Sequence, residues 1–210
     1  MNYTLVVARY NESVEWTKHF DKEALVIYDK SSNPMHGHIP VPNVGREAET
    51  YLRYIVDNYH SLPEYVVFVQ GDPFPHMPLT SRHTFKADFD SQLATRPTET
   101  QCLLTKWATD PSIDEYVGLH VSDYYNILFG RRPTYIRFAQ GCQYIVPRSV
   151  LLSNPLEAYR SIHQMLLNNT IVDVQEVYRP TRFDPNAMNA WTFERMAPYV
   201  FSSGALRNQL

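Results

Sequence analysis

The amino-acid sequence predicts an α/β fold in which a mostly parallel sheet is covered by helices. Apolar strand-like segments alternate with helix-like segments through the first 70 residues, the pattern expected of parallel strands joined by helices. One strand-like segment, Tyr65–Val69, is apolar throughout, as strands buried on both faces are. The chain has 210 residues and is 44% hydrophobic, which suffices for one domain with a substantial core.

The elements of the first half follow from periodicity and from turn residues. The expected strands are Tyr3–Ala8, Ala24–Lys30 and Tyr65–Val69, the expected helices are Ser13–Phe20 and Gly45–Tyr59, and Ser31–Asn43 is expected to be a loop. The second helix places five apolar residues on one face, which are Ala48, Tyr51, Leu52, Ile55 and Val56.

The second half predicts a more mixed arrangement. Arg137–Val146 is strand-like, Arg148–Leu152 begins a helix that Pro155 interrupts, Leu156–Leu167 is a longer helix, and Trp191–Met196 begins a last helix that ends near Pro198. With no internal repeat or low-complexity linker, residues 1–210 are expected to form a single domain. Its polar end suggests that it could be the N-terminal part of a longer chain.

Composition argues against several classes of function. The net charge is -3, so we expect no nucleic-acid partner. No apolar run approaches the ~20 residues of a spanning helix, so no membrane insertion is expected, nor a signal peptide. Cys102 and Cys142 have no metal-ligand spacing, which favours reduced thiols in an intracellular protein. The sequence lacks CxxC, HExxH, Walker and GxGxxG motifs.

Aromatic residues make up 13% of the chain, with 15 tyrosines. Aromatic side chains supply much of the burial energy of protein cores, and their faces also stack on sugars and bases. Core packing is the preferred explanation, and a sugar or nucleotide ligand is compatible with the same excess.

Gln70-Gly71-Asp72 is the most informative stretch, because it directly follows the apolar strand. The carboxyl ends of strands border the ligand crevice of open α/β sheets. A carboxylate there suits Mg²⁺ or Mn²⁺, which take one or two carboxylates together with phosphate oxygens. His76 could be a further ligand, although an ordinary loop histidine is the simpler interpretation. The structural alternative for Asp72 is a turn residue before Pro73.

Two other segments are placed to bind a nucleotide. Arg9-Tyr10-Asn11-Glu12 follows the first strand, where polar groups could contact a base or ribose, or could simply cap the next helix. Arg46 stands at a helix start, which favours anions, and its guanidinium suits phosphate. The alternative for Arg46 is an exposed first-turn residue beside Glu47.

Asp88-Phe89-Asp90 has the spacing of a metal-binding DxD motif, but no apolar strand leads into it, so two solvated surface carboxylates are expected. Gln140–Gln143 lies inside a strand-like run, where an amide could orient a substrate or could be a hydrogen-bonded core residue. His120–Tyr125, which includes Asp123, and Trp191–Arg195 mix aromatic and charged residues suited to sugar hydroxyls, and ordinary packing would explain them equally well.

Taken together, four segments resemble a family of domains of unknown function related to GT-A glycosyltransferases. They are ARYNE (Ala8–Glu12), NVGREAETYL (Asn43–Leu52), FVQGDP (Phe68–Pro73) and GCQYIVPRSVL (Gly141–Leu151). The resemblance extends from Tyr3 to about Met196. The chain also looks similar to the N-terminal glycosyltransferase domains of multidomain viral proteins that decorate capsid glycans.

This resemblance implies a GT-A fold, a UDP-sugar donor, a glycan acceptor and a Mn²⁺ or Mg²⁺ ion. By position, the uridine would meet Ala8, Arg9, Tyr10, Asn11 and Glu12. Arg46 would lie near the diphosphate, and Gln70-Gly71-Asp72 would take the place of the DxD motif, with Gln70 replacing its first Asp and Asp72 holding the metal with His76. Gln143 would fall beside the sugar, and Asp123 and Trp191–Glu194 toward the acceptor.

The sequence therefore leads to the hypothesis of a metal-dependent glycosyltransferase. It would move a hexose or deoxyhexose from UDP to a glycan hydroxyl, with retention by analogy, in capsid glycan synthesis and in the cytoplasm of a host cell. The alternatives are a non-catalytic nucleotide- or glycan-binding module and, ranked last, a metal-dependent phosphoesterase.

Overall fold

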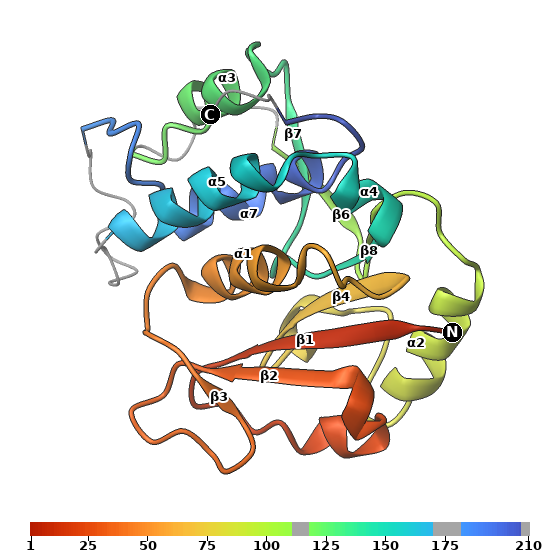
Figure 1. Ribbon diagram of the computed structural model, residues 1–210. Coiled ribbons are helices and arrows are strands. Elements are labelled where there is room, and N and C mark those ends of the chain that lie inside the picture. Colours follow the sequence, from red (N-terminus) through yellow and green to blue (C-terminus); the bar gives the residue numbers. More distant parts are fainter. Residues whose placement is uncertain (111–117, 170–181, 207–210) are drawn as a thin grey trace.

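The computed structural model of the chain describes residues 1–110, 118–169 and 182–206 (Figure 1). The expected α/β class is confirmed: a six-stranded sheet in the order β3-β2-β1-β4-β8-β5 lies between helices. Its strands are β1 Tyr3–Arg9, β2 Leu25–Asp29, β3 Ile39–Pro40, β4 Tyr65–Gln70, β5 Gln101–Cys102 and β8 Tyr144–Pro147. Of these six strands, β8 is antiparallel to both of its neighbours, β4 and β5, and the other five run in the same direction. A two-stranded antiparallel sheet is formed by β6 Trp107–Asp110 and β7 Ile136–Ala139.

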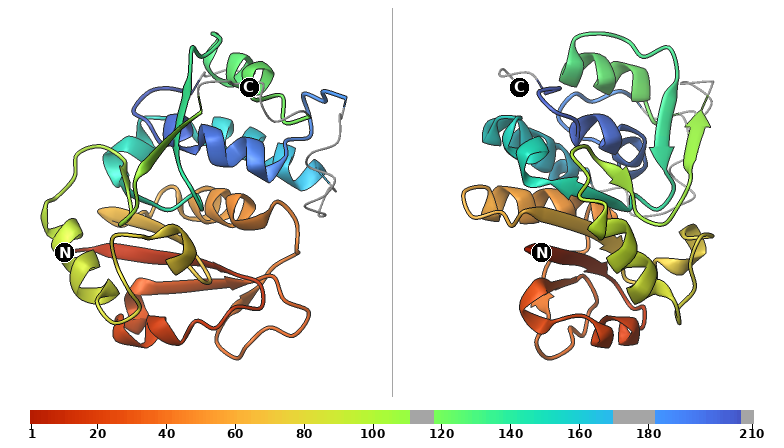
Figure 2. Two further views of the ribbon diagram at one scale, coloured as in Figure 1. Left: turned by 180° about the vertical axis from the view of Figure 1, so that it is seen from behind. Right: turned by 90° about the vertical axis from the view of Figure 1, so that its right-hand side faces the viewer.

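Helices cover both faces of the six-stranded sheet. In the described ranges the α-helices are α1 Arg46–Asn58, α2 Phe85–Ala94, α3 Val121–Phe129, α4 Arg148–Leu152, α5 Leu156–Asn168 and α7 Ala190–Val200, and the short 3-10 helices are η1 Glu15–His19, η2 Lys22–Ala24 and η3 Phe74–His76. In Figure 1, α1 lies on one face with α5 and α7 stacked beyond it, and Figure 2 shows α2 on the other side of the sheet.

Alternate side chains of β1 are buried in two hydrophobic cores, one on each face of the six-stranded sheet. Val6 and Ala8 belong to the core under α1, α5 and α7, whereas Leu5 and Val7 belong to the core under η1 and α2. Successive strand residues point to opposite faces, so an unbroken apolar run is what a sheet covered on both sides requires.

Several expected elements differ in the structure. Arg137–Val146 is not one strand: the chain reverses at Gly141 and Cys142, whose φ values are 76° and 55°, and the segment divides into β7 and β8 of different sheets. The helix expected at Ser13–Phe20 is only the short η1. Helix α7 runs through Pro198 to Val200.

The sheet order places a topological switch point between β1 and β4. From β1 the chain pairs first with β2 on one side, and after α1 it returns to pair β4 with β1 on the other side. Ala8 pairs with Gln70, so the two strands end side by side. In open α/β sheets the ligand crevice lies outside the carboxyl ends of strands at such a point.

Among the residues described, no helix is long and apolar enough to cross a membrane. Cys102 and Cys142 are both buried and form no disulfide.

Candidate functional site

A cavity of about 400 Å³ lies at the carboxyl ends of β1 and β4. The structure brings together here eight residues that the sequence singled out, from three separate segments: Ala8, Arg9, Tyr10 and Glu12 after β1, Arg46 at the start of α1, and Gln70, Asp72 and His76 after β4. Of the remaining expected contacts, Asn11 lines a neighbouring pocket instead. The volume is in the range of small-molecule sites.

Glycine at position 71 allows the two strand exits to approach closely. A Cβ added to Gly71 would lie 2.7 Å from Oε2 of Glu12 and 3.2 Å from Cα of Arg9. The same Glu12 oxygen accepts a hydrogen bond of 2.7 Å from the Tyr10 N–H. The ring of Tyr10 is 47% exposed, so it offers a flat surface at the cavity.

Two of the cations at the cavity are tied into the protein. The Arg9 guanidinium donates to Asp29 at 2.5 Å and to the Glu12 carbonyl at 3.0 Å. The Lys30 ammonium donates to Glu49 at 2.5 Å and to the Pro42 and Val44 carbonyls. These two side chains therefore build the wall of the cavity.

Asp29 and Glu49 are the anions that hold those cations, and both are fully buried. Burial by itself would raise the pKa of Asp29, but hydrogen bonds from Ser31, His38 and the Met35 N–H hold that pKa well below its usual range. Burial likewise opposes ionisation of Glu49, but a hydrogen bond with His163 and the contacts to Lys30 and Arg53 lower its pKa to about 2.

Arg46 is the cation best placed to meet a ligand. Its side chain is 49% exposed, with Glu47 at 3.6 Å as an ion-pair partner, and its guanidinium lies 5.2 Å from the centre of the Trp191 ring. Within the described part of the chain no side chain caps α1, whose N-cap Gly45 has a left-handed conformation. Arg46 itself has φ 49°, a conformation that non-glycine residues rarely adopt and that accumulates at functional sites. The first turn and Arg46 thus form a place suited to an anion.

Asp72 lies at the cavity and not on bulk surface, with its side chain 32% exposed. One of its oxygens, Oδ1, accepts from the Arg82 guanidinium at 2.8 Å, and Arg82 stacks 4.6 Å from the centre of the Phe74 ring. The turn before Asp72 is fixed because the Trp16 indole donates to the Gly71 carbonyl at 2.8 Å.

The residues present fit a cation that is shared with a ligand. His76 lines the same cavity as Asp72 and packs on Gly141, where a Cβ would lie 2.7 Å from its Cδ2 atom. Over the residues described, no group of three or more His, Cys, Asp or Glu side chains is arranged to hold a metal ion by itself. Mg²⁺ is commonly held by one or two carboxylates, with phosphate oxygens and waters completing its shell, so a single carboxylate with a neighbouring histidine suits this type of site.

Gln143 is fully buried and does not line the cavity. It accepts from the Gln70 N–H at 3.4 Å and donates to the Pro73 carbonyl at 3.2 Å. Of the two interpretations from the sequence, the hydrogen-bonded core amide is the one that the structure shows. Gln143 is a positioning residue for the turn that carries Asp72.

Asp123 is placed on α3, away from the residues that line the cavity. It pairs with His120 at 3.5 Å and with Arg132 at 3.6 Å, and its side chain is 40% exposed. Asp88 and Asp90 lie on α2, where Asp88 accepts from Thr80 and Asp90 pairs with Lys86. As expected from the sequence, Asp88 and Asp90 are surface carboxylates and not a metal-binding pair at the end of a strand.

Glu194 belongs to the Trp191–Glu194 segment that the resemblance placed toward the acceptor, but no role of its own was predicted for this residue. Its Oε1 accepts from the Gly141 N–H at 2.7 Å, and the side chain is only 14% exposed. Burial, and after it the nearby charge of Glu47, raises the pKa of Glu194 to about 7, against the opposing effect of Arg195, Gly141 and Arg46. A carboxyl group with such a pKa can hold or release a proton near neutrality. The position is on α7, one turn from Trp191, and only its burial in the folded protein makes it distinctive.

The model of a family described as "Protein of unknown function (DUF3431)" matches residues 5–95. That segment runs from within β1 through α2 and so includes both strand exits, Arg46 and Asp72, whereas Gln143 and Glu194 lie beyond it. No curated protein and no solved structure matches the chain.

Proposed function

We propose that the protein is a glycosyltransferase of the GT-A type that takes a hexose or deoxyhexose from UDP and transfers it to a hydroxyl of a glycan. The observation that carries this proposal is the cavity at the switch point, which joins Asp72 and His76 after β4, Arg46 at an uncapped helix start, and the Tyr10 ring after β1. Together they supply sites for a cation, a diphosphate and a base.

The diphosphate of the donor is assigned to Arg46 and the first turn of α1. A guanidinium makes paired hydrogen bonds to phosphate oxygens, and helix N–H groups add a favourable dipole. Arg9 and Lys30 are committed to buried carboxylates, so among the described residues that line the cavity Arg46, with its side chain 49% exposed, is the arginine or lysine best able to contact the ligand. The exposed Tyr10 ring provides a surface on which a flat base can stack.

The cation is assigned to Asp72, with His76 beside it. A divalent ion at this place would neutralise the negative charge that develops on the departing diphosphate. Arg82 now pairs with Asp72, so binding of the cation requires that Arg82 turn away.

The transfer breaks the bond between the anomeric carbon and the diphosphate oxygen, which leaves with the bonding electrons. A new bond forms between that carbon and the acceptor oxygen, whose proton must go to a base. Glu194 does not line the cavity, but it accepts from the N–H of Gly141, against which His76 of the cavity packs. Burial raises its pKa to about 7, and we assign the proton to this carboxyl group. Gln143 contributes by holding the Asp72 turn and does not contact the sugar in this proposal.

A non-catalytic nucleotide-binding module is the second candidate, and the Asp72–Arg82 ion pair favours it, because an occupied carboxylate binds metal less readily. Incubation with UDP-glucose, UDP-galactose and UDP-N-acetylglucosamine separates the two. A transferase releases UDP from at least one donor, by slow hydrolysis if no acceptor is present, and a binding module releases none from any.

Calorimetric titration of UDP in the presence and absence of Mn²⁺ tests the site itself. We expect Mn²⁺ to strengthen binding to the wild type, Asp72→Asn to remove this dependence on metal, and Arg46→Gln to weaken binding with and without metal. Arg160→Gln is the matched control, because Arg160 is a half-exposed arginine on α5 that pairs only with its neighbour Glu157 in the contacts described. Binding that keeps its Mn²⁺ dependence in Asp72→Asn would refute the assignment.

A further inference from the structure

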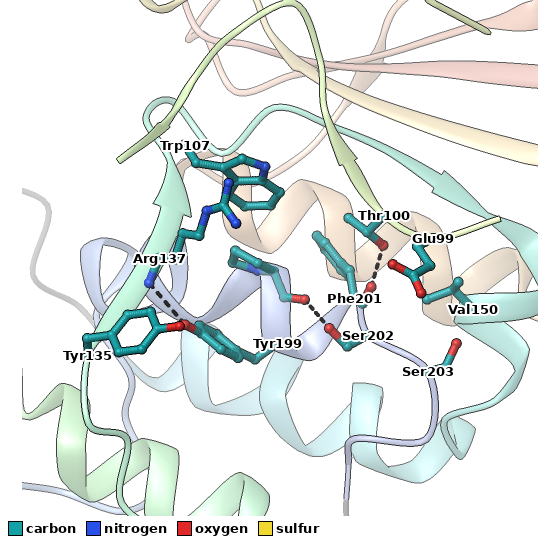
Figure 3. A pocket seen from close by; sticks show the side chains of 11 residues that line it. Glu99, Thr100, Trp107, Tyr135, Arg137, Val150, Tyr199, Phe201, Ser202 and Ser203 are labelled. Carbon is teal, nitrogen blue, oxygen red and sulfur yellow. Dashed lines mark hydrogen bonds between the residues drawn. The ribbon is translucent and has the colours of Figure 1, made fainter. Parts of the chain in front are cut away.

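A second pocket, of about 490 Å³, lies at the far end of α7 from the cavity just described. Trp191, in the first turn of α7, contacts Arg46 of the first cavity, whereas Tyr199 near the end of α7 lines the second pocket. Eight residues of helix separate the two, or roughly 12 Å along its axis. Figure 3 shows the second pocket between β7 and the chain that leaves α7. Nothing in the proposed chemistry uses it.

One wall of this pocket is the outer face of the β6–β7 ribbon. Trp107 pairs with Ala139, so Trp107 and Arg137 are diagonal neighbours on the same face of the ribbon. The Arg137 guanidinium lies 4.7 Å from the centre of the Trp107 ring. Tyr135, two residues before Arg137, is 55% exposed, whereas Ile136 and Phe138 point the other way into the core.

The opposite wall is the end of α7 with the loop before β5. Tyr199 accepts a hydrogen bond of 2.9 Å from the Arg137 N–H, and a phenol that accepts one bond still has its own proton to donate. The Thr100 hydroxyl donates to the Phe201 carbonyl, and the Ser202 hydroxyl donates to the Pro198 carbonyl (Figure 3). Each of these two hydroxyls is thereby oriented, with its oxygen lone pairs left to accept.

The pocket thus combines a carboxylate that can only accept, Glu99, with a guanidinium that can only donate, Arg137. A ligand made of hydroxyl groups, which both donate and accept, satisfies both. A simple anion or cation would be attracted by one of these charges and repelled by the other. The exposed Tyr135 ring adds a face whose negative quadrupole attracts the C–H groups of a sugar ring.

We propose that this pocket binds a neutral oligosaccharide, stacked on Tyr135 and hydrogen-bonded between Glu99 and Arg137. Its identification with part of the glycan acceptor rests on the proposed glycosyltransferase function. Because the pocket lies more than one sugar ring away from the donor cavity along α7, the acceptor would be an extended chain and not a monosaccharide.

The three tryptophans of the chain allow a test that separates the two sites, because each reports on a different place. Trp107 lies in the second pocket, Trp191 lies against Arg46, and the Trp16 indole binds the Gly71 carbonyl beside Asp72. Their three indole N–H signals in a ¹H–¹⁵N spectrum, assigned with single Trp→Phe variants, are followed during titration.

The probes are cellohexaose, mannohexaose and chitohexaose at millimolar concentration, and separately UDP with Mg²⁺. We expect at least one oligosaccharide to move the Trp107 signal while Trp16 stays in place. Failure of all three to move Trp107, or movement of Trp191 alone, overturns the second site. UDP with Mg²⁺ is expected to move the Trp16 and Trp191 signals. If it does not, the proposed donor site is wrong, and this result is distinct from the result of the oligosaccharide titrations.

Two variants locate the contact without disturbing the core. Tyr135 and Glu99 are exposed, so Tyr135→Ala and Glu99→Gln should fold normally, and each should weaken oligosaccharide binding by roughly tenfold. Arg160→Gln on α5 is the control and should leave it unchanged. Undiminished binding in both pocket variants overturns the proposal.

Discussion

Replacing Glu194 by Gln should make the protein more stable at alkaline pH. Glu194 is a nearly buried carboxyl group whose Oε1 accepts the Gly141 N–H. Glutamine has almost the same shape and keeps an oxygen that can accept this bond. What the substitution removes is the ability to ionise, and with it the cost of placing a negative charge beside Glu47 in a dry environment.

The size of the effect follows from the pKa of Glu194, which rises from 4.5 to about 7 on folding. Since the folded pKa is the higher one, the folded protein holds a proton between these values that the unfolded chain has released. Stability is therefore full below the unfolded pKa and is lost as pH rises through the folded pKa. A shift of this size corresponds to about 3 kcal/mol.

The assay is urea unfolding of wild type and Glu194→Gln at pH 4 and pH 9. The two proteins should have similar free energies of unfolding at pH 4, and the variant should be more stable by up to about 3 kcal/mol at pH 9. Glu157→Gln, at an exposed position on α5, should show no such difference between the two pH values. A difference between wild type and Glu194→Gln that does not change with pH would refute the reasoning.

Three further changes test other parts of the site by urea unfolding. Glu49→Gln removes the buried negative charge that pairs with Lys30 and Arg53 and that contacts His163, so it should cost about 3–5 kcal/mol near neutral pH. The wild type should lose that advantage as pH falls from 4.5 toward about 2, and an equal cost at both ends of this range would contradict the account. Gly141→Ala strains a residue with φ 76° and forces its Cβ against His76, so it should cost roughly 1–3 kcal/mol, and an unchanged midpoint would argue against that packing. Gln143→Leu leaves two backbone groups of the Asp72 turn unpaired and should cost about 1–3 kcal/mol for each. It should also weaken UDP binding, although the residue lies outside the cavity. Full UDP binding in a destabilised variant would show that Gln143 contributes to folding and not to the site.

The part of the fold that builds the donor cavity was predictable from the sequence because its signals are local. The apolar run of β4 and the helical spacing of α1 each show in a short window of residues. Parallel strands end at the same edge of a sheet, and for that reason Arg9–Glu12 and Gln70–Asp72 were expected to meet before their pairing was known.

The remaining differences arise from features that no short window contains. The segment Arg137–Val146 is apolar on both sides of Gly141, so its pattern does not reveal that the chain reverses there and joins two sheets. Gln143 has the same side chain whether it faces a ligand or the core, and Glu194 acquires its raised pKa only because the fold buries it, beside the charge of Glu47. Whether a polar residue is buried depends on the tertiary structure, and a short stretch of sequence does not show it.

The most direct test of the central claim is a crystal structure of the protein with UDP and Mn²⁺, with the metal located by its anomalous signal. We expect the diphosphate at Arg46 and the start of α1, with the manganese peak against Asp72 and Arg82 turned away. A nucleotide bound elsewhere, or a manganese ion that does not contact Asp72, would contradict the claim.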